Sequence, residues 1–172
     1  AWEAFYGGNF NEPWTYGVPE LPAGGRKLRE SLADTRRIAA PGCNASTVAL
    51  ALAPGVARGL IDPTQIVASL AVGPSGAGLT LRPNLLASQI LGSAGPYAVG
   101  GVHRHIPEIE QALEDAATDA DATVRVTFTP LLVPMSRGIL AVCTAPLADG
   151  VDAAQVQQAW EEAYDGEPFV EV

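Results

Sequence analysis

Apolar runs alternate with stretches of helical spacing along most of the chain. β-Strands are predicted where apolar residues run together or alternate with polar ones, at 65–72, 123–129 and 138–145. Helices are predicted where apolar residues recur at helical spacing, at 46–57, 84–91, 108–117 and 152–164. Pro107 is suited to a first helical turn and Asp152 to an N-cap. The order of these elements predicts a mixed α/β (α+β) fold in which helices cover a sheet.

The first quarter of the chain has a different pattern. Gly and Pro are frequent in residues 1–25 and are interleaved with aromatic residues, which predicts a loop held against a surface rather than a long helix. A short helix is expected at 26–32 and a short strand at 37–40. The chain opens without Met, and residues 167–172 have the pattern of an unfinished strand. We therefore expect a piece of a longer protein.

Cys43 follows the Pro41-Gly42 break that ends the strand at 37–40. The next helix, with Asn44 or Ser46 as its N-cap, places this thiol at a strand-to-helix turn. The positive end of the helix dipole favours a thiolate there, and a thiolate is the form of cysteine that attacks carbonyl carbon. Taken alone, a cysteine in apolar surroundings is more often a small core residue, and Cys143 inside the strand at 138–145 fits that interpretation.

Composition limits the function. The 172 residues are 48% hydrophobic and 17% charged, typical of one globular domain of residues 1–172. A net charge of −9 makes nucleic acid a poor partner, and no apolar run is long enough to span a membrane. Two distant cysteines form no disulfide framework, which indicates a reducing, cytoplasmic location. No GxGxxG or P-loop motif is present, so we expect no nucleotide-binding Rossmann domain in this chain.

Other candidate residues gather around short polar motifs. His103 and His105 could relay a proton to a bound carbonyl oxygen, and Arg104 and Arg137 could bind carboxylate or phosphate. The turn Ser75-Gly76-Ala77-Gly78 follows a strand, where backbone N–H groups can approach a phosphate or a cofactor ring. It could equally be an ordinary turn. Two histidines do not fill a metal site, so no metal is expected.

A series of motifs resembles one enzyme family over almost the whole chain. They are Tyr16-Gly17-Val18-Pro19-Glu20-Leu21, Pro41-Gly42-Cys43, Ser75-Gly76-Ala77-Gly78, His103-Arg104-His105-Ile106-Pro107-Glu108-Ile109, and the segment from Phe128 to Leu140. In this order and spacing they resemble the N-acetyl-gamma-glutamyl-phosphate reductases of arginine biosynthesis. The resemblance implies a substrate and catalytic domain like the C-terminal domain of glyceraldehyde-3-phosphate-dehydrogenase-like enzymes, a cytoplasmic homo-oligomer, and an NADPH-binding Rossmann domain outside this chain.

The resemblance also implies roles for individual residues. Cys43 is expected to attack the acyl phosphate and form a thioester, which NADPH then reduces to the semialdehyde. His103 is the expected acid/base, with His105 as second choice. The expected substrate contacts are Arg104, His105, Ser136 and Arg137, and the expected cofactor contacts are Ser75, Gly76, Ala77 and Gly78. Three positions depart from the family pattern: Asn44 replaces an aromatic residue, Leu79 a basic one, and Pro74 a small one.

Other functions remain compatible with these residues. The chain could be a non-catalytic, self-associating scaffold in which Cys43 is structural. It could belong to a related aspartate-semialdehyde-type dehydrogenase, because the same thiol chemistry serves other acyl phosphates. A Cys–His acyl hydrolase is a further alternative, supported only by the presence of Cys and His.

Overall fold

The computed structural model describes residues 2–78, 80 and 82–172. Its centre is a four-stranded mixed sheet in the order β6-β7-β5-β8. The central strands β5 and β7 are parallel, and β6 and β8 pair with them in antiparallel fashion. The prediction of a mixed sheet with helices is confirmed. The strand bounds are β5 Ile66–Val72, β6 Gly95–Pro96, β7 Val126–Leu132 and β8 Ile139–Thr144.

Strand β7 is shifted from its predicted position at 123–129. Ile66 pairs with Val126 and Val72 with Leu132, so the partner strand sets where β7 begins and ends. Pro130 lies inside β7 although it has no N–H to donate. Its carbonyl is used instead, because it accepts a hydrogen bond of 3.1 Å from the backbone N–H of Tyr97.

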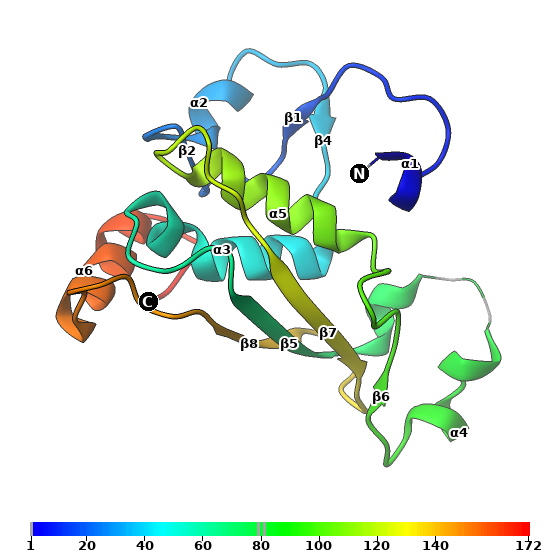
Figure 1. Cartoon of the computed structure of the whole chain (residues 1–172). Helices are drawn as coiled ribbons and strands as arrows, with labels where there is room; N and C mark the ends of the chain where they lie inside the picture. Colours follow the sequence, from blue (N-terminus) through cyan, green and yellow to red (C-terminus); the bar gives the residue numbers. More distant parts are fainter. Residues whose placement is uncertain (1, 79, 81) are drawn as a thin grey trace.

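Two helices lie on one face of the sheet, with α3 and α5 side by side (Figure 1). Small residues such as Ala45, Ala49 and Ala53 are fully buried on α3 and allow close packing. Ile109 and Leu113 of α5 are equally buried. Both helices begin three residues earlier than predicted, so Cys43 and His105 are each a first helical residue. Their bounds are α3 Cys43–Ala57 and α5 His105–Ala116.

Helix α6, Ala153–Tyr164, begins as predicted. The Asp152 side chain accepts a hydrogen bond of 2.9 Å from the backbone N–H of Gln155, whose side chain accepts one from Asp152 N–H, so the two residues form a capping box. The indole Nε1 of Trp160 donates to the Ala51 carbonyl at 2.9 Å, and the hydroxyl of Tyr164 donates to that of Leu50. These bonds fix α6 against the C-terminal half of α3.

The opposite face of the sheet has no covering helix among the described residues (Figure 1). Apolar side chains on this face are exposed to solvent: Leu140 by 64%, Val142 by 60% and Val67 by 43%. Val67 pairs with Thr144, Ser69 with Val142 and Ala71 with Leu140, so the exposed residues of β5 and β8 point to the same face of the sheet. We call Val67, Leu140 and Val142 the open sheet face.

The first 42 residues form short elements outside the main sheet (Figure 1). Strands β1 and β4 pair in parallel, and β2 and β3 form a hairpin. The predicted short helix and strand are present, although residues 167–172, predicted as a strand, have no regular structure. Glu167 instead binds Lys27 at 3.3 Å and Arg29 at 2.5 Å. The bounds are α1 Trp2–Phe5, β1 Thr15–Tyr16, β2 Pro22–Ala23, β3 Arg26–Lys27, α2 Leu28–Leu32 and β4 Ile38–Ala39.

An excursion between β5 and β7 projects from the sheet at the β6 edge (Figure 1). The helix predicted at 84–91 is replaced there by two shorter pieces, since Pro83 starts a 3-10 turn that does not continue into α4. Within the described part of the chain, no helix has the length and apolar character needed to cross a membrane. The bounds are η1 Pro74–Ala77, η2 Pro83–Leu85 and α4 Ala87–Ile90.

Candidate functional site

The thiol of Cys43 is exposed at the N-terminus of the most buried helix. Neither predicted N-cap is correct, because Asn44 and Ser46 lie inside α3 and Gly42 is the extended residue before it. Ser46 Oγ and Thr47 Oγ1 donate instead to the Cys43 carbonyl, at 3.1 and 2.9 Å. The predicted strand-to-helix turn is present, and the unpaired N–H groups of the first helical turn lie next to the thiol.

A carboxylate from α5 holds the turn before Cys43. Glu108 Oε1 accepts a hydrogen bond from the backbone N–H of Gly42 at 2.7 Å and another from the Tyr16 hydroxyl at 2.9 Å. Burial, together with the neighbouring Glu108 carboxylate, raises the pKa of Tyr16, so its hydroxyl stays protonated and able to donate. Residues from β1, α5 and the turn are thereby joined directly in front of the thiol.

His105 packs against the same turn. Gly42 has no side chain, and a Cβ atom there would lie 2.4 Å from His105 Nε2 and 2.8 Å from Glu108 Oε2. The ring is buried, and its Nδ1 has no hydrogen-bond partner among the described residues. Burial lowers the pKa of His105, and the Glu108 carboxylate partly offsets this. His105 is therefore the histidine that lies against the backbone carrying Cys43.

His103 is also buried, and its orientation is well defined. Its Nδ1 accepts a hydrogen bond of 3.1 Å from the backbone N–H of His105, so in the neutral ring Nε2 carries the proton. The ring centroid lies 4.7 Å from that of His105 and 4.9 Å from that of Phe128. Burial, with smaller contributions from His105 and Arg104, lowers the pKa of His103 to about 4. His103 is therefore uncharged at neutral pH.

A second link joins the thiol to His103. Asn44, directly after Cys43, donates from Nδ2 to the Tyr97 hydroxyl at 3.1 Å, and the Tyr97 ring lies 5.6 Å from the ring of His103. The fold thus gathers Cys43, Asn44, Tyr97, His103 and His105 at the start of α3. Sequence reasoning found the cysteine and the histidines but assigned no role to Tyr16, Tyr97 or Glu108. For Glu108, the signal was its spacing of three residues from His105 on one helix.

The predicted cofactor turn lies beside the thiol. Residues 75–77 fall in η1 and Gly78 ends it, and a Cβ atom on Gly76 would lie 3.9 Å from Cys43 Sγ. All four residues are exposed. Gly76 leaves the backbone bare next to the sulfur, which suits the close approach of a flat ring. The departure at Leu79 lies outside the described residues.

Of the predicted substrate contacts, Arg104, Ser136 and Arg137 are exposed, whereas His105 is buried. The backbone of Arg137 packs against Gly73, the residue that precedes η1 and the cofactor turn. A Cβ atom on Gly73 would lie 2.9 Å from the Arg137 Cα. Ser136 and Arg137 follow the carboxyl end of β7, and the cofactor turn follows that of the parallel strand β5, so both lie at one sheet edge. Arg104 is exposed before α5, and its carbonyl accepts a hydrogen bond of 2.6 Å from the Tyr6 hydroxyl.

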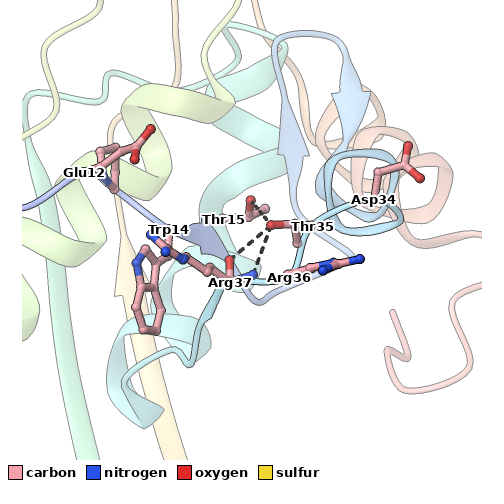
Figure 2. A pocket seen from close by; sticks show the side chains of 8 residues that line it. Glu12, Trp14, Thr15, Asp34, Thr35, Arg36 and Arg37 are labelled. Atoms are coloured by element: carbon pink, nitrogen blue, oxygen red, sulfur yellow. Dashed lines mark hydrogen bonds between the residues drawn. The ribbon is translucent and has the colours of Figure 1, made fainter.

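Hollows elsewhere contain none of these residues. One, of about 320 Å³, is lined by residues 12–15 and 34–37, which lead into β1 and β4 (Figure 2). There Thr35 Oγ1 hydrogen bonds with Thr15 Oγ1 and with the Arg37 backbone. Another, of about 310 Å³, is lined by three acids of the α6 region. The described residues form no group of three or more His, Cys, Asp and Glu side chains able to hold a metal ion.

Relatives of this chain are reductases of about twice its length. It is 63% identical over all of its 172 residues to an N-acetyl-gamma-glutamyl-phosphate reductase of Leifsonia xyli subsp. xyli, covering 49% of that protein. It is 56% identical over 98% of its length to the enzyme of the same name in Micrococcus luteus, covering 47% of it. The resemblance expected from the motifs is confirmed. The chain spans about half the length of these curated relatives.

Solved structures with the same fold are semialdehyde dehydrogenases. Aspartate semialdehyde dehydrogenase from Francisella tularensis matches 87% of this chain and 51% of its own, with a TM-score of 0.61 and 15% identity. Aspartate semialdehyde dehydrogenase II from Vibrio cholerae matches 86% and 48%, with a TM-score of 0.61 and 18% identity. Residues 43–172 match the family described as "Semialdehyde dehydrogenase, dimerisation domain". The chain, with its thiol at the first matched residue, belongs to the family of semialdehyde dehydrogenase dimerisation domains.

Proposed function

We propose that this chain is the catalytic part of an NADPH-dependent reductase of N-acetyl-γ-glutamyl phosphate, acting in arginine biosynthesis in the cytoplasm. The observation that carries the proposal is the exposed Cys43 thiol at the start of a buried helix, with the Gly76 backbone next to its sulfur and the buried His105 against the turn before it. The 63% identity to a reductase of that name favours this substrate over other acyl phosphates.

The first step is an acyl transfer to the thiol. Cys43 loses its proton to solvent and attacks the acyl carbon; the C–S bond forms as the C–O bond to phosphate breaks, and phosphate leaves with the electron pair. The start of α3 favours the negative charge on sulfur, because its N–H groups and dipole are positive there. NADPH, when bound, supplies the hydride that reduces the resulting thioester to the semialdehyde and frees the Cys43 thiolate.

His103 acts as a neutral hydrogen-bond donor. Because its Nδ1 accepts the His105 N–H, only Nε2–H is available to a carbonyl oxygen that gains negative charge during attack. Its low pKa keeps it in this form at neutral pH. His105 and Glu108 fix the turn that carries the thiol, since both contact the position of Gly42. This assigns the oxygen-stabilising role to His103 and a positioning role to His105.

The remaining predicted contacts have positions that suit their roles. Ser75, Gly76, Ala77 and Gly78 would hold the nicotinamide end of the cofactor next to Cys43 Sγ. The exposed Arg104, Ser136 and Arg137 are available to the anionic groups of the substrate. We assign the nucleotide-binding Rossmann domain to the half of the relatives' length that this chain does not span.

We also propose that two copies of this chain associate through the open sheet face. Val67, Leu140 and Val142 form an apolar surface that a soluble protein rarely leaves uncovered. A second copy suits this surface because the matched family is described as a dimerisation domain. Sheet-on-sheet packing of two such faces buries the exposed side chains of both copies.

The substitution Cys43→Ser in the full-length protein tests the proposed reaction. We expect NADPH oxidation dependent on N-acetyl-γ-glutamyl phosphate to fall at least about a thousandfold, because the hydroxyl is a poor nucleophile without a strong base. Cys143→Ser, which changes the half-buried thiol of β8, is the matched control and should retain activity. Activity in Cys43→Ser would exclude the thioester route. If the protein reduced aspartyl phosphate faster than N-acetyl-γ-glutamyl phosphate, it would be an aspartate-semialdehyde-type dehydrogenase. Ester hydrolysis without NADPH would favour a Cys–His acyl hydrolase.

A further inference from the structure

Asn44 is a buried polar side chain at the thiol. Only 1% of its surface is exposed, although it occupies the second position of α3. A buried amide is costly unless its donors and acceptor are used. Here Nδ2 donates to the Tyr97 hydroxyl at 3.1 Å, and Oδ1 lies 3.8 Å from Cys43 Sγ, within reach of its S–H. The two ends of the amide therefore serve Tyr97 and Cys43.

Tyr97 is itself held firmly. Its backbone N–H donates to the Pro130 carbonyl at 3.1 Å, and its ring lies against His103. The next residue, Ala98, has a φ of 45°, the only positive value outside glycine in the described part of the chain. Such backbone strain persists where the surroundings hold the segment. Burial raises the pKa of Tyr97, so its hydroxyl remains protonated beside Asn44.

We propose that Asn44 and Tyr97 are a positioning pair for the catalytic thiol, an inference that rests on the proposed function. The Tyr97 hydroxyl accepts the Asn44 Nδ2–H and so sets which way the amide faces. Oδ1 then points to Cys43 and accepts its S–H in the resting enzyme, while the tyrosine ring supports His103.

Alkylation of Cys43 by iodoacetamide at pH 7, followed by mass spectrometry in the full-length protein, tests the pair without requiring turnover. In Tyr97→Phe the amide is free to rotate and can present Nδ2–H to the thiolate. We expect alkylation to accelerate about 3- to 10-fold, because one hydrogen bond to the charged sulfur populates the thiolate while lowering its nucleophilicity by roughly half as much on a logarithmic scale. In an Asn44→Leu background, where no amide can rotate, Tyr97→Phe should change the rate by less than about 1.5-fold.

Tyr6→Phe is the matched control, because it removes a hydroxyl bonded to the nearby Arg104 carbonyl and should leave the alkylation rate unchanged. Equal effects of Tyr97→Phe in both backgrounds, or no effect in the native background, overturn the proposal. Melting temperatures of all variants separate unfolding from repositioning. If Cys43→Ser retains reductase activity, the proposed function fails. The alkylation result still tests whether Asn44 and Tyr97 position the thiol, because it does not depend on turnover.

Discussion

The imidazole of His105 occupies the space that a side chain at Gly42 would need, since a Cβ atom there would lie 2.4 Å from His105 Nε2. The residue before the thiol must therefore be glycine, although its φ of −70° is one that any residue can adopt. A contact between residues 63 positions apart (105 − 42) thus fixes the chain immediately before Cys43.

Gly42→Ala should displace His105 or the turn that carries Cys43. We expect the free energy of unfolding to fall by roughly 1–3 kcal/mol, because overpacking a rigid site forces neighbours to shift. In the full-length enzyme kcat should fall at least about tenfold, since acyl transfer depends on the position of the sulfur. Urea unfolding and steady-state kinetics measure both. Gly95→Ala, where a Cβ atom meets nothing within 4 Å, is the control, and equal behaviour of the two variants contradicts the steric argument.

Acid should destabilise the protein through His103. Its pKa is about 4 in the fold, below the value of about 6.5 expected in the unfolded chain. Between these two values the unfolded state binds more protons, so stability falls as pH decreases from 6.5 to 4, by at most about 1.4 kcal/mol per pH unit for this group. His105 shifts in the same direction. Urea unfolding gives the free energy of unfolding at pH 7 and at pH 5. The difference between the two values should be smaller in His103→Gln than in the native protein, and an equal difference would show that the pH dependence does not come from His103.

Leu140→Asp should weaken self-association through the open sheet face. A charge placed against an apolar partner surface loses water without gaining a counterion, which we expect to weaken the dimer at least about tenfold. Sedimentation velocity over a range of concentrations measures this. Phe169→Asp is the control, because this exposed apolar side chain lies in the C-terminal tail outside the sheet. Equal dimer dissociation constants in Leu140→Asp and Phe169→Asp would show that the interface does not include the open sheet face.

Asp152→Ala should remove the capping box of α6. We expect the free energy of unfolding to fall by about 1 kcal/mol, because the first turn loses a side-chain acceptor for the Gln155 N–H. Asp149→Ala removes an exposed acid of the preceding turn and should have less than half of that effect. Chemical denaturation of both variants is sufficient to compare them.

The sequence was most informative where structure is local. The capping residue Asp152, the strand at 65–72 and the break before Cys43 were all predictable from neighbouring residues. The start of α3 was not, because Gly42 is held by Glu108, which lies 66 positions away in the chain. The end of β7 was predicted too early, because a proline has no N–H to donate and is expected to end a strand. The strand continues past Pro130, whose carbonyl accepts the hydrogen bond from Tyr97 N–H.

The candidate site divides in the same way. Residue type and motif order identified Cys43, His103 and His105 as candidates, and the fold gathers them at one helix start. The link through Asn44 and Tyr97 could not be foreseen, because it joins α3 to the excursion that follows β5 and depends on how Tyr97 is anchored to β7. Whether the exposed arginines bind substrate remains a prediction.

The helix that presents Cys43 has a consequence for thermal inactivation. Residues Ala45, Val48, Ala49 and Ala53 of α3 are completely buried, so the first turn of this helix cannot loosen without opening the core. The hydrogen-bonded amide protons of this helix, from Ser46 onward, should therefore exchange with solvent only when the whole molecule unfolds. Heating should therefore abolish activity at the temperature at which the fold melts, without an earlier stage in which an intact fold carries a disordered thiol.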